Sequence, residues 1–174
     1  MATVQTTYRY LVVDEDGLED DLRHGLAVLL AASLDDGERY LHRAWRTLRP
    51  SFRVVALQAD GEPIGQVSAF WVPTRPRVRL VGLGDAAVAP DHRRRNVGRT
   101  VCGLAVQEAW RLHASGILLK TKPMRKVFTE LGFAAVTAGP FFYVEHGERT
   151  MHPDWMAAFA TELPRSVELE EGDF

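Results

Sequence analysis

Hydrophobic positions recur with two different periods along the chain, and each change of period marks a new element. The aromatic and β-branched run TYRYLVV (7–13) ends at the acidic, glycine-containing DEDG, which predicts an opening strand. Leucines then recur at three- and four-residue spacing and predict a helix over about 18–33. A shorter apolar stripe over 40–48 predicts a second helix that is stopped by Pro50.

The middle of the chain predicts a β-hairpin, a further extended run and a long helix. Two apolar runs in FRVVALQADGEPIGQVSAFWV (52–72) flank the turn-forming ADGEP, which favours a hairpin. The run VRLVGLGDAAV (78–88) is again extended, although it is rich in small residues. A stripe of helical period then predicts a helix over about 97–114, with Gly116 as a left-handed cap.

The last third of the chain predicts shorter elements. The apolar run ILLK (117–120) is typical of a buried strand, and PMRKVFTEL predicts a short helix that begins at Pro123 and is closed by Gly132. FFYVE (141–145) and WMAAFATEL (155–163) predict the last two strands. The order of elements predicts an α/β or α+β architecture with helices on both faces of the sheet.

Length and composition limit the number of domains and the classes of ligand that the chain can have. The 174 residues, 46% hydrophobic and 25% charged, fit a single domain over residues 1–174. The start lacks a basic segment followed by an apolar run, and no stretch reaches the roughly 18 uncharged apolar residues of a membrane span. We therefore expect a cytoplasmic protein without membrane contact. The lone Cys102 excludes an internal disulfide, no histidine spacing suggests a metal site, and a net charge of −2 argues against nucleic-acid binding.

Positive charge is nevertheless concentrated in APDHRRRNVGRT (89–100), where four arginines and a histidine surround one glycine. The predicted helix follows this loop directly, so unpaired backbone N–H groups and the positive end of the helix dipole converge on it. Gly98 lets a ligand approach the backbone, and the arginines can add charge-assisted bonds to phosphate. A solvated arginine face is the alternative. The glycines and alanines of the preceding strand, where valine or isoleucine is usual, favour a ligand.

The segment RNVGRT, with Arg95, Gly98 and Thr100, resembles the acyl-CoA signature of the GCN5-related N-acetyltransferases (GNAT): Arg or Gln, two residues, Gly, one residue, then Gly or Ala. Thr100 departs from the last position. VFTELGF (127–133) is similar to the family's short helix that ends in Gly-Phe. The resemblance implies a mixed, mostly antiparallel central sheet of about seven strands. It also implies that acetyl-CoA is bound by Ala87, Val88, Ala89, Arg93, Arg94, Arg95, Asn96, Val97, Gly98, Arg99, Thr100, Thr121 and Phe128.

The resemblance further implies direct transfer of an acetyl group from acetyl-CoA to a primary amine. An alkylamine of pKa about 10.4 is only about one part in a thousand free base near pH 7.4, a barrier of roughly 4 kcal/mol unless a base assists. Asp85, which stands in an apolar strand where many family members carry an acid, is the candidate base. The alternative is a structural carboxylate bonded to its neighbours. The family polarises the thioester oxygen with a backbone N–H, which we expect near Val88 or Ala89.

The residue that many family members use to protonate the leaving thiolate is absent. Phe128 stands where those relatives have Tyr, and Thr121 stands where they often have Asn. The thiolate, of pKa about 8.5, leaves unaided, or another donor such as Tyr143 or Thr129 substitutes, or the domain binds acyl-CoA without catalysis. We favour the first two alternatives.

Fewer features of the sequence indicate the acceptor substrate. Asp35 and Asp36 lie in a segment that commonly borders the acceptor cleft in GNAT proteins, although solvated acids at a helix start would look the same. AGPFFY and the closing Asp173 and Phe174 are similar to the aminoglycoside 2′-N-acetyltransferases, whose tail forms part of the amine site. This resemblance implies a small cationic acceptor, an aminosugar or a polyamine. A distant similarity to nodulation acyltransferases keeps a longer acyl chain open, and pairing among relatives keeps a homodimer open.

Overall fold

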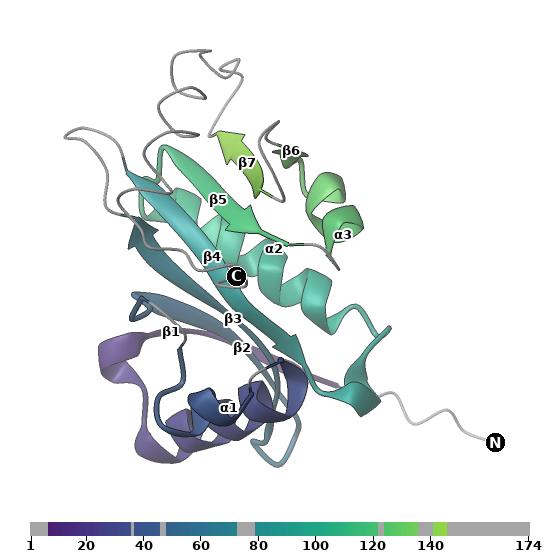
Figure 1. Ribbon diagram of the computed structural model, residues 1–174. Helices are drawn as coiled ribbons and strands as arrows, with labels where there is room; N and C mark the ends of the chain where they lie inside the picture. The colour runs from purple at the N-terminus through teal and green to yellow at the C-terminus, as the bar shows by residue number, and fades with distance from the viewer. Residues whose placement is uncertain are drawn as a thin grey trace.

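The computed structural model describes residues 7–35, 37–45, 48–72, 79–121, 124–135 and 141–145, of which residues 120 and 141–145 are described by their backbone. The strands are β1 (Arg9–Asp14), β2 (Phe52–Leu57), β3 (Pro63–Val72), β4 (Leu80–Val88), β5 (Gly116–Lys120), β6 (Ala134–Ala135) and β7 (Phe141–Glu145). They form one seven-stranded sheet in the order β1-β2-β3-β4-β5-β7-β6 (Figure 1). Neighbouring strands are antiparallel except β4 and β5, which run parallel. The mixed, mostly antiparallel sheet is thus confirmed.

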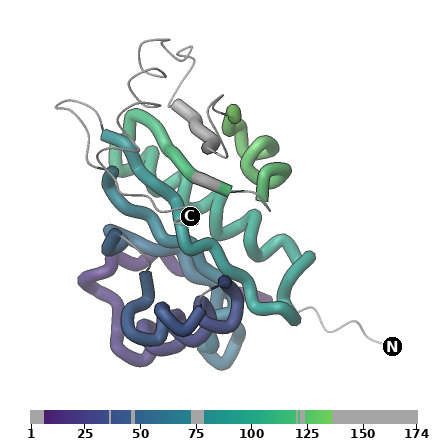
Figure 2. Tube along the Cα trace, in the orientation of Figure 1, coloured from purple at the N-terminus to yellow at the C-terminus, as the bar shows by residue number. Residues whose placement is uncertain are grey.

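Helices cover both faces of the sheet, as predicted. Helix α1 (Asp20–Ser33) lies against one face and α2 (Val97–Arg111) against the other (Figures 1 and 2). The remaining helical elements are α3 (Arg125–Glu130) and the 3₁₀ turns η1 (Glu15–Gly17), η2 (Gly37–Leu41) and η3 (Pro90–His92). No helix in the described ranges is long and apolar enough to cross a membrane.

Strand β2 shows why the sheet needs helices on both faces. All of its residues are buried. Phe52, Val54 and Ala56 belong to the core beneath α2. Val55 and Leu57 belong to the core beneath α1. Because successive side chains of a strand point to opposite faces, a strand that is covered on both sides is mostly apolar, and Arg53 is the one charged residue of β2.

The start of α2 approaches the sheet closely at Gly65 of β3. A Cβ atom at Gly65 would lie 2.7 Å from Cγ1 of Val97, the buried first residue of α2. Glycine is needed here because any larger residue would push the helix away. The contact holds the N-terminal end of α2, and the arginine loop before it, against strands β3 and β4.

Strand β4 loses one of its two partners halfway along its length. It pairs with β5 from Leu80 to Leu83 but continues to Val88. From Gly84 onwards no described strand pairs with its edge on the β5 side, because β5 ends at Lys120, one residue after the last pair. Backbone groups of β4 along this edge therefore have no strand partner among the described residues.

A bulge interrupts β4 on the side of β3. Gln66 of β3 is opposite Ala87, whereas Ser68, two residues further on, is opposite Gly84. Strand β4 therefore holds one extra residue in this interval, and Asp85 within it has a left-handed backbone with φ of 48°. A non-glycine residue with positive φ is strained, and such residues cluster at functional sites.

The helix predicted over 40–48 is wrong beyond its first residues. Helical structure is limited to η2, which ends at Leu41. Further on, residues 42–45 are not helical, and the carbonyl of Ala44 accepts a hydrogen bond from Nη2 of Arg53. A side chain on a distant strand thus holds this segment, and local periodicity cannot reveal that.

Other boundaries differ in smaller ways. Helix α2 ends at Arg111, and the left-handed residue after it is His113, with φ of 60°, while the predicted cap Gly116 begins β5. The two-residue strand β6 was not predicted, and the predicted strand 155–163 lies outside the described residues. The remaining strands and helices are found within a few residues of their predicted positions.

Candidate active site

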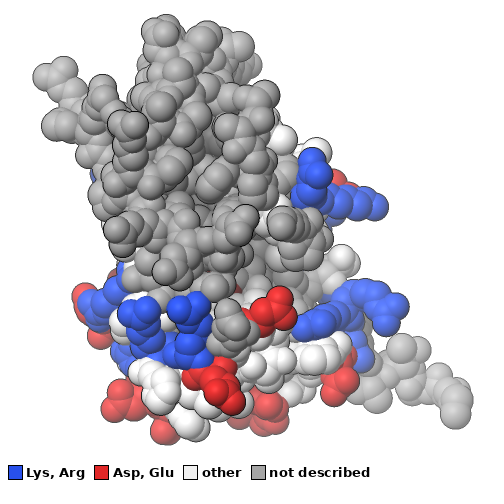
Figure 3. Space-filling view, in the orientation of Figure 1, with Lys and Arg blue, Asp and Glu red and all other residues white. Residues whose placement is uncertain are grey.

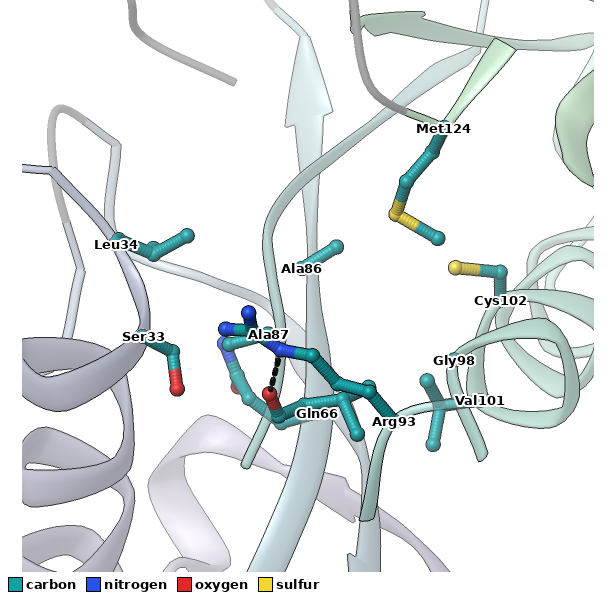
Figure 4. A pocket seen from close by; sticks show the side chains of 11 residues that line it. Ser33, Leu34, Gln66, Ala86, Ala87, Arg93, Gly98, Val101, Cys102 and Met124 are labelled. Atoms are coloured by element: carbon teal, nitrogen blue, oxygen red, sulfur yellow. Dashed lines mark hydrogen bonds between the residues drawn. The ribbon is translucent and has the colours of Figure 1, made fainter. Parts of the chain in front are cut away.

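A pocket of about 430 Å³ lies between the C-terminal end of α1, the open half of β4 and the first turns of α2 (Figure 4). Its size falls within the range of about 300–1,000 Å³ typical of small-molecule sites. Figure 4 shows α1 on one side of the pocket and α2 on the other, with Gln66 and the β4 alanines between them. The lining residues are Ser33, Leu34, Gln66, Ala86, Ala87, Val88, Arg93, Gly98, Val101, Cys102 and Met124.

The arginine loop enters α2 through two left-handed residues. Arg94 and Asn96 have φ of 59° and 63°. The amide of Thr100 makes a helical bond of 2.9 Å to the carbonyl of Asn96, so the amides that precede it have no carbonyl partner within α2. Gly98, which carries one of them, lines the pocket. This end of the pocket therefore combines helix N-terminal amides with the positive end of the α2 dipole, a combination that favours an anion.

One of the four predicted arginines lines the pocket. Arg93 donates from Nε to the carbonyl of Val88 at 3.0 Å, the bond drawn in Figure 4, and this holds its guanidinium group against β4. Arg99 pairs with Glu130 of α3 instead. Arg94 and Arg95 are exposed. Figure 3 shows basic side chains gathered over the region where α2 begins, although charges of both signs occur elsewhere on this face.

Asp85 lies beside the pocket, next to two residues that line it. Its side chain is 7% exposed, and its Oδ1 accepts a hydrogen bond of 2.8 Å from the hydroxyl of Tyr40. Its backbone carbonyl accepts a second bond from Nε2 of Gln66. The carboxylate is therefore buried and oriented. Both predicted roles, base and structural carboxylate, remain compatible with this placement.

The amide predicted to polarise the thioester is not that of Ala89. The Ala89 N–H donates to the carbonyl of Ile64 on β3 at 2.9 Å, so it is already used within the sheet. Backbone groups of consecutive residues in an antiparallel strand point to opposite sides. The N–H of Val88 therefore points away from β3, toward the open edge of β4, and Val88 is the better candidate of the two.

A family model described as the acetyltransferase (GNAT) family matches residues 20–133, more than half of the chain. The chain belongs to this GNAT family. A search of curated proteins returned no match.

Solved structures share the GNAT fold with this chain at low sequence identity. A GNAT family N-acetyltransferase from Escherichia coli in complex with CoA is 15% identical, with a TM-score of 0.63, over 91% of this chain and 88% of that one. A GNAT acetyltransferase from Brucella melitensis in complex with acetyl-CoA is 17% identical, with a TM-score of 0.61, over 82% and 91%. An aminoglycoside acetyltransferase from an uncultured soil metagenomic sample is 17% identical, with a TM-score of 0.60, over 84% and 99%.

The loop geometry favours aligning the GNAT signature two residues earlier, with its first position at Arg93 and not at Arg95. With Arg93 as its first residue, the signature's two glycine positions fall on Asn96 and Gly98. Asn96 has the left-handed backbone that glycine adopts most easily and that Asn tolerates, whereas Gly98 has no positive φ. In this register Gly98 satisfies the last position, and the mismatch at Thr100 disappears.

Several side chains predicted to bind the cofactor have other partners in the structure. Val97 and Phe128 are buried in the core, where the Phe128 ring packs edge-on against Phe133 with centroids 5.2 Å apart. The Thr100 hydroxyl donates to the Asn96 carbonyl at 3.0 Å. The Thr121 hydroxyl accepts from the amide of Met124 at 3.2 Å. Of these side chains, none lines the pocket.

The residues predicted for the acceptor and for proton donation are only partly described. Asp35 is exposed just beyond α1, next to the pocket residues Ser33 and Leu34. Tyr143 lies in β7 opposite Leu118 of β5, and only its backbone is described. Asp36, Asp173 and Phe174 lie outside the described residues.

Sequence reasoning missed most of the pocket wall. Ser33, at the last turn of α1, has a buried hydroxyl oxygen without a hydrogen-bond partner among the described residues. Gln66 is fully buried in an apolar strand, a polarity that could have marked it. Cys102 was predicted as a buried small residue, which is confirmed, and burial raises the pKa of its thiol to about 12. The other missed wall residues are Leu34, Ala86, Val101 and Met124.

Proposed function

We propose that this GNAT protein transfers an acetyl group from acetyl-CoA to a primary amine of a small cationic molecule. The observation that carries the proposal is that one pocket joins the N-terminal end of α2 to the open edge of β4. These two features match the two halves of an acyl-CoA, a charged diphosphate and a neutral arm that ends in a thioester. The CoA and acetyl-CoA complexes of the structural neighbours support the same cofactor.

In this proposal the diphosphate lies at the start of α2. The amides of the first turn and the guanidinium of Arg93 supply donors for its oxygens. Gly98 leaves room for it, because a Cβ there would meet the protein only at 3.4 Å, from Val88 Cγ2, an ordinary contact. The protein itself therefore does not require glycine at this position, and the space it leaves is available to the ligand. The pantetheine arm then follows β4 and brings the thioester to the Val88 N–H.

The amine is proposed to enter from the α1 side. The C-terminal end of a helix carries the negative end of its dipole, which favours a cation, and Asp85 and the exposed Asp35 are near this end of the pocket. The Ser33 hydroxyl, which has no hydrogen-bond partner among the described residues, offers a hydrogen bond to a polar acceptor substrate at the same place. The aminoglycoside acetyltransferase among the structural neighbours supports an aminosugar as one member of this class.

The reaction then needs a base, a donor for the thioester oxygen and departure of the thiolate. Asp85 accepts a proton from the ammonium, directly or through a water, and the free amine attacks the thioester carbonyl. The Val88 N–H stabilises the negative oxygen of the tetrahedral intermediate. As that intermediate collapses, the new C–N bond remains, the C–S bond breaks and the CoA thiolate leaves, and the nitrogen releases its second proton to water to give the neutral amide. Phe128 offers it no proton, so it leaves unaided or with the help of Tyr143.

A thiol-release assay with acetyl-CoA tests the proposal directly, with spermidine, kanamycin and a lysine-containing peptide as acceptors. We expect thiol release with spermidine or kanamycin to exceed that with the peptide, because the acceptor is small and cationic. Calorimetry with CoA measures cofactor binding separately. If CoA gives no heat and no amine is acetylated, the proposal is wrong.

The burial of Phe128 favours a second candidate, a domain that binds acyl-CoA without transferring the acyl group. In that case CoA would raise the melting temperature while no amine is acetylated, and Phe128→Tyr would not create activity. A series from acetyl-CoA to longer acyl-CoA thioesters tests in the same assay whether the pocket prefers a longer chain.

A further inference from the structure

Asp85 is held by a buried polar network that spans four other elements of the fold. Arg53 of β2 is 0% exposed, and its Nε donates to Oε2 of Glu15, itself 2% exposed, at 2.7 Å. Nη1 of Arg53 donates to Oε1 of Gln66 at 3.0 Å. Gln66 in turn donates to the carbonyl of Asp85. Tyr40 completes the set by its hydrogen bond to the Asp85 carboxylate. We call Glu15, Tyr40, Arg53 and Gln66 the buried network.

We propose that Gln66, held by the Glu15–Arg53 ion pair, is a positioning residue for Asp85. This inference rests on the proposed function, in which Asp85 is the base. Arg53 touches neither the pocket nor Asp85 and acts through Gln66.

The ion pair fixes the orientation of the Gln66 amide group. A guanidinium only donates hydrogen bonds and a backbone carbonyl only accepts them. The carbonyl oxygen of the Gln66 side chain must therefore face Arg53, and its NH₂ must face Asp85. The opposite rotamer would set donor against donor and acceptor against acceptor. Arg53 thus determines that the NH₂ of the Gln66 side chain, and not its carbonyl oxygen, faces the bulge.

The bond from Gln66 is made at the strained point of β4. Asp85 has the left-handed backbone of the bulge, and its carbonyl is the group that Gln66 holds. The bulge adds one residue to β4, and removing it would turn each later residue to the opposite side of the strand. The Val88 N–H would then point to β3. Holding the bulge therefore places both the base and the amide proposed for the thioester.

The same cation also holds the segment that carries Tyr40. Nη2 of Arg53 donates to the carbonyl of Ala44, just after η2, the turn that contains Tyr40. The carboxylate of Asp85 is thus oriented by a hydroxyl whose own segment is tied to Arg53. Two hydrogen bonds of Asp85, one at its carbonyl and one at its carboxylate, are thus linked to one guanidinium.

Stability alone does not account for this arrangement. Replacing a buried ion pair by apolar residues of similar size is often neutral or stabilising, because the charges must be removed from water. Apart from Arg53, Gln66 and Ser68, the buried positions of strands β2 and β3 are apolar. The network supplies orientation, which an apolar core would not.

Gln66→Glu is the direct test, with Ser68→Ala as its matched control. The Glu variant keeps an oxygen toward Arg53 but turns a second oxygen, in place of N–H, toward the Asp85 carbonyl. Ser68 accepts from the same Arg53 nitrogen at 3.1 Å and from Nε2 of Gln66 at a longer 3.4 Å, and it has no hydrogen bond to Asp85 and no place in the pocket wall. With acetyl-CoA and the best acceptor of the amine panel, we expect kcat of Gln66→Glu to fall roughly tenfold or more, with KM for acetyl-CoA within about twofold. Ser68→Ala keeps both within about twofold.

The pH profile separates positioning from a purely structural role. Among the described residues, the titratable and charged groups of the buried network and its ion-pair partner are Tyr40 of η2, Arg53 of β2, Glu15 of η1 and Arg23 of α1. A new carboxylate at position 66 favours the protonated form of Asp85. We expect the acidic limb of the kcat profile of Gln66→Glu to move to higher pH. Loss of stability alone would lower the melting temperature and leave that limb in place.

Two further variants keep the test independent of folding and of direct contact with the ligand, since Gln66 lines the pocket. Tyr40→Phe removes only the hydroxyl donor, and we expect the acidic limb to move in the same direction. Glu15→Leu combined with Arg53→Met replaces the ion pair by apolar side chains. We expect this double variant to keep its melting temperature and to lose kcat as Gln66→Glu does.

Asp85→Asn distinguishes failure of this inference from failure of the proposed function. If Asp85→Asn is as active as the wild type, the base and its positioning network are both wrong. If it loses activity while Gln66→Glu and the double variant keep the wild-type kcat and pH profile, only the network inference is overturned.

If no amine is acetylated, amide hydrogen exchange tests the network inference without an activity assay. We then expect amides of residues 84–89 to exchange at least about tenfold faster in the double variant than in Ser68→Ala, and equal rates refute the network.

Discussion

The end of the pocket at the start of α2 takes its residues from one stretch of chain, residues 88–102. Asp85 and its buried network, in contrast, come from five separate elements. The loop offers backbone amides, which almost any side chain leaves available, and an anion is bound by their number and direction. The base needs one carboxylate in one orientation, which requires particular side chains at particular distances. We therefore expect the proposed cofactor end to tolerate substitution of loop side chains other than Gly98, and the proposed base end not to.

The largest effect should come from Asp85→Asn. Asn tolerates a left-handed backbone, so the bulge is kept, but its amide cannot accept the proton. We expect kcat to fall by about 10²–10⁴ with the Kd of acetyl-CoA unchanged. Steady-state kinetics and calorimetry measure the two quantities. Asp91→Asn, at an exposed position of the loop before α2, is the control with a small effect, and equal effects of the two variants would contradict the difference between the two ends.

Arg53→Met should have the next largest effect, on stability. The single change leaves Glu15 buried with Arg23 as its remaining cation. We expect the free energy of unfolding to fall by about 3–5 kcal/mol, measured by urea denaturation. Glu15→Leu added to Arg53→Met should restore most of that loss. A single variant as stable as the wild type would show that the base end tolerates substitution as well as the loop does.

Gly98→Ala sharpens the comparison from the cofactor end. Alanine favours the helix by up to about 1 kcal/mol over glycine, so the protein should be as stable or slightly more stable. The added methyl group occupies space proposed for the diphosphate, and we expect the Kd of CoA to rise about tenfold, which corresponds to ~1.4 kcal/mol. Thermal unfolding and calorimetry report the two opposite changes. An unchanged Kd of CoA would show that Gly98 does not contact the cofactor.

The smallest effect should come from Glu130→Gln. Its partner Arg99 is 52% exposed and Glu130 is 37% exposed, so solvent screens the pair. We expect less than about 1 kcal/mol in the free energy of unfolding and less than about threefold in the Kd of CoA, both smaller still at high salt. A larger loss of CoA affinity would mean that Arg99 is oriented for the ligand by this pair.

The same contrast explains what could be predicted from the sequence. The order of strands and helices follows from hydrophobic period, and the arginine loop is marked by composition and by its place between strand and helix. The role of Ala89 could not be judged, because one extra residue in β4 decides which amides face the open edge. Ser33 and Gln66 escaped notice because contacts between distant elements define their roles. The helix predicted after η2 failed for the same reason, since Arg53 holds that segment.

Cys102 gives the pocket a chemical property beyond shape. It is the only cysteine of the chain, it lies on the pocket wall, and burial raises its pKa to about 12. A cysteine attacks a thioester as the thiolate, which is nearly absent for such a group at neutral pH. An acetyl thioester bound beside Cys102, as proposed, therefore keeps its acyl group for the amine and does not pass it to the cysteine.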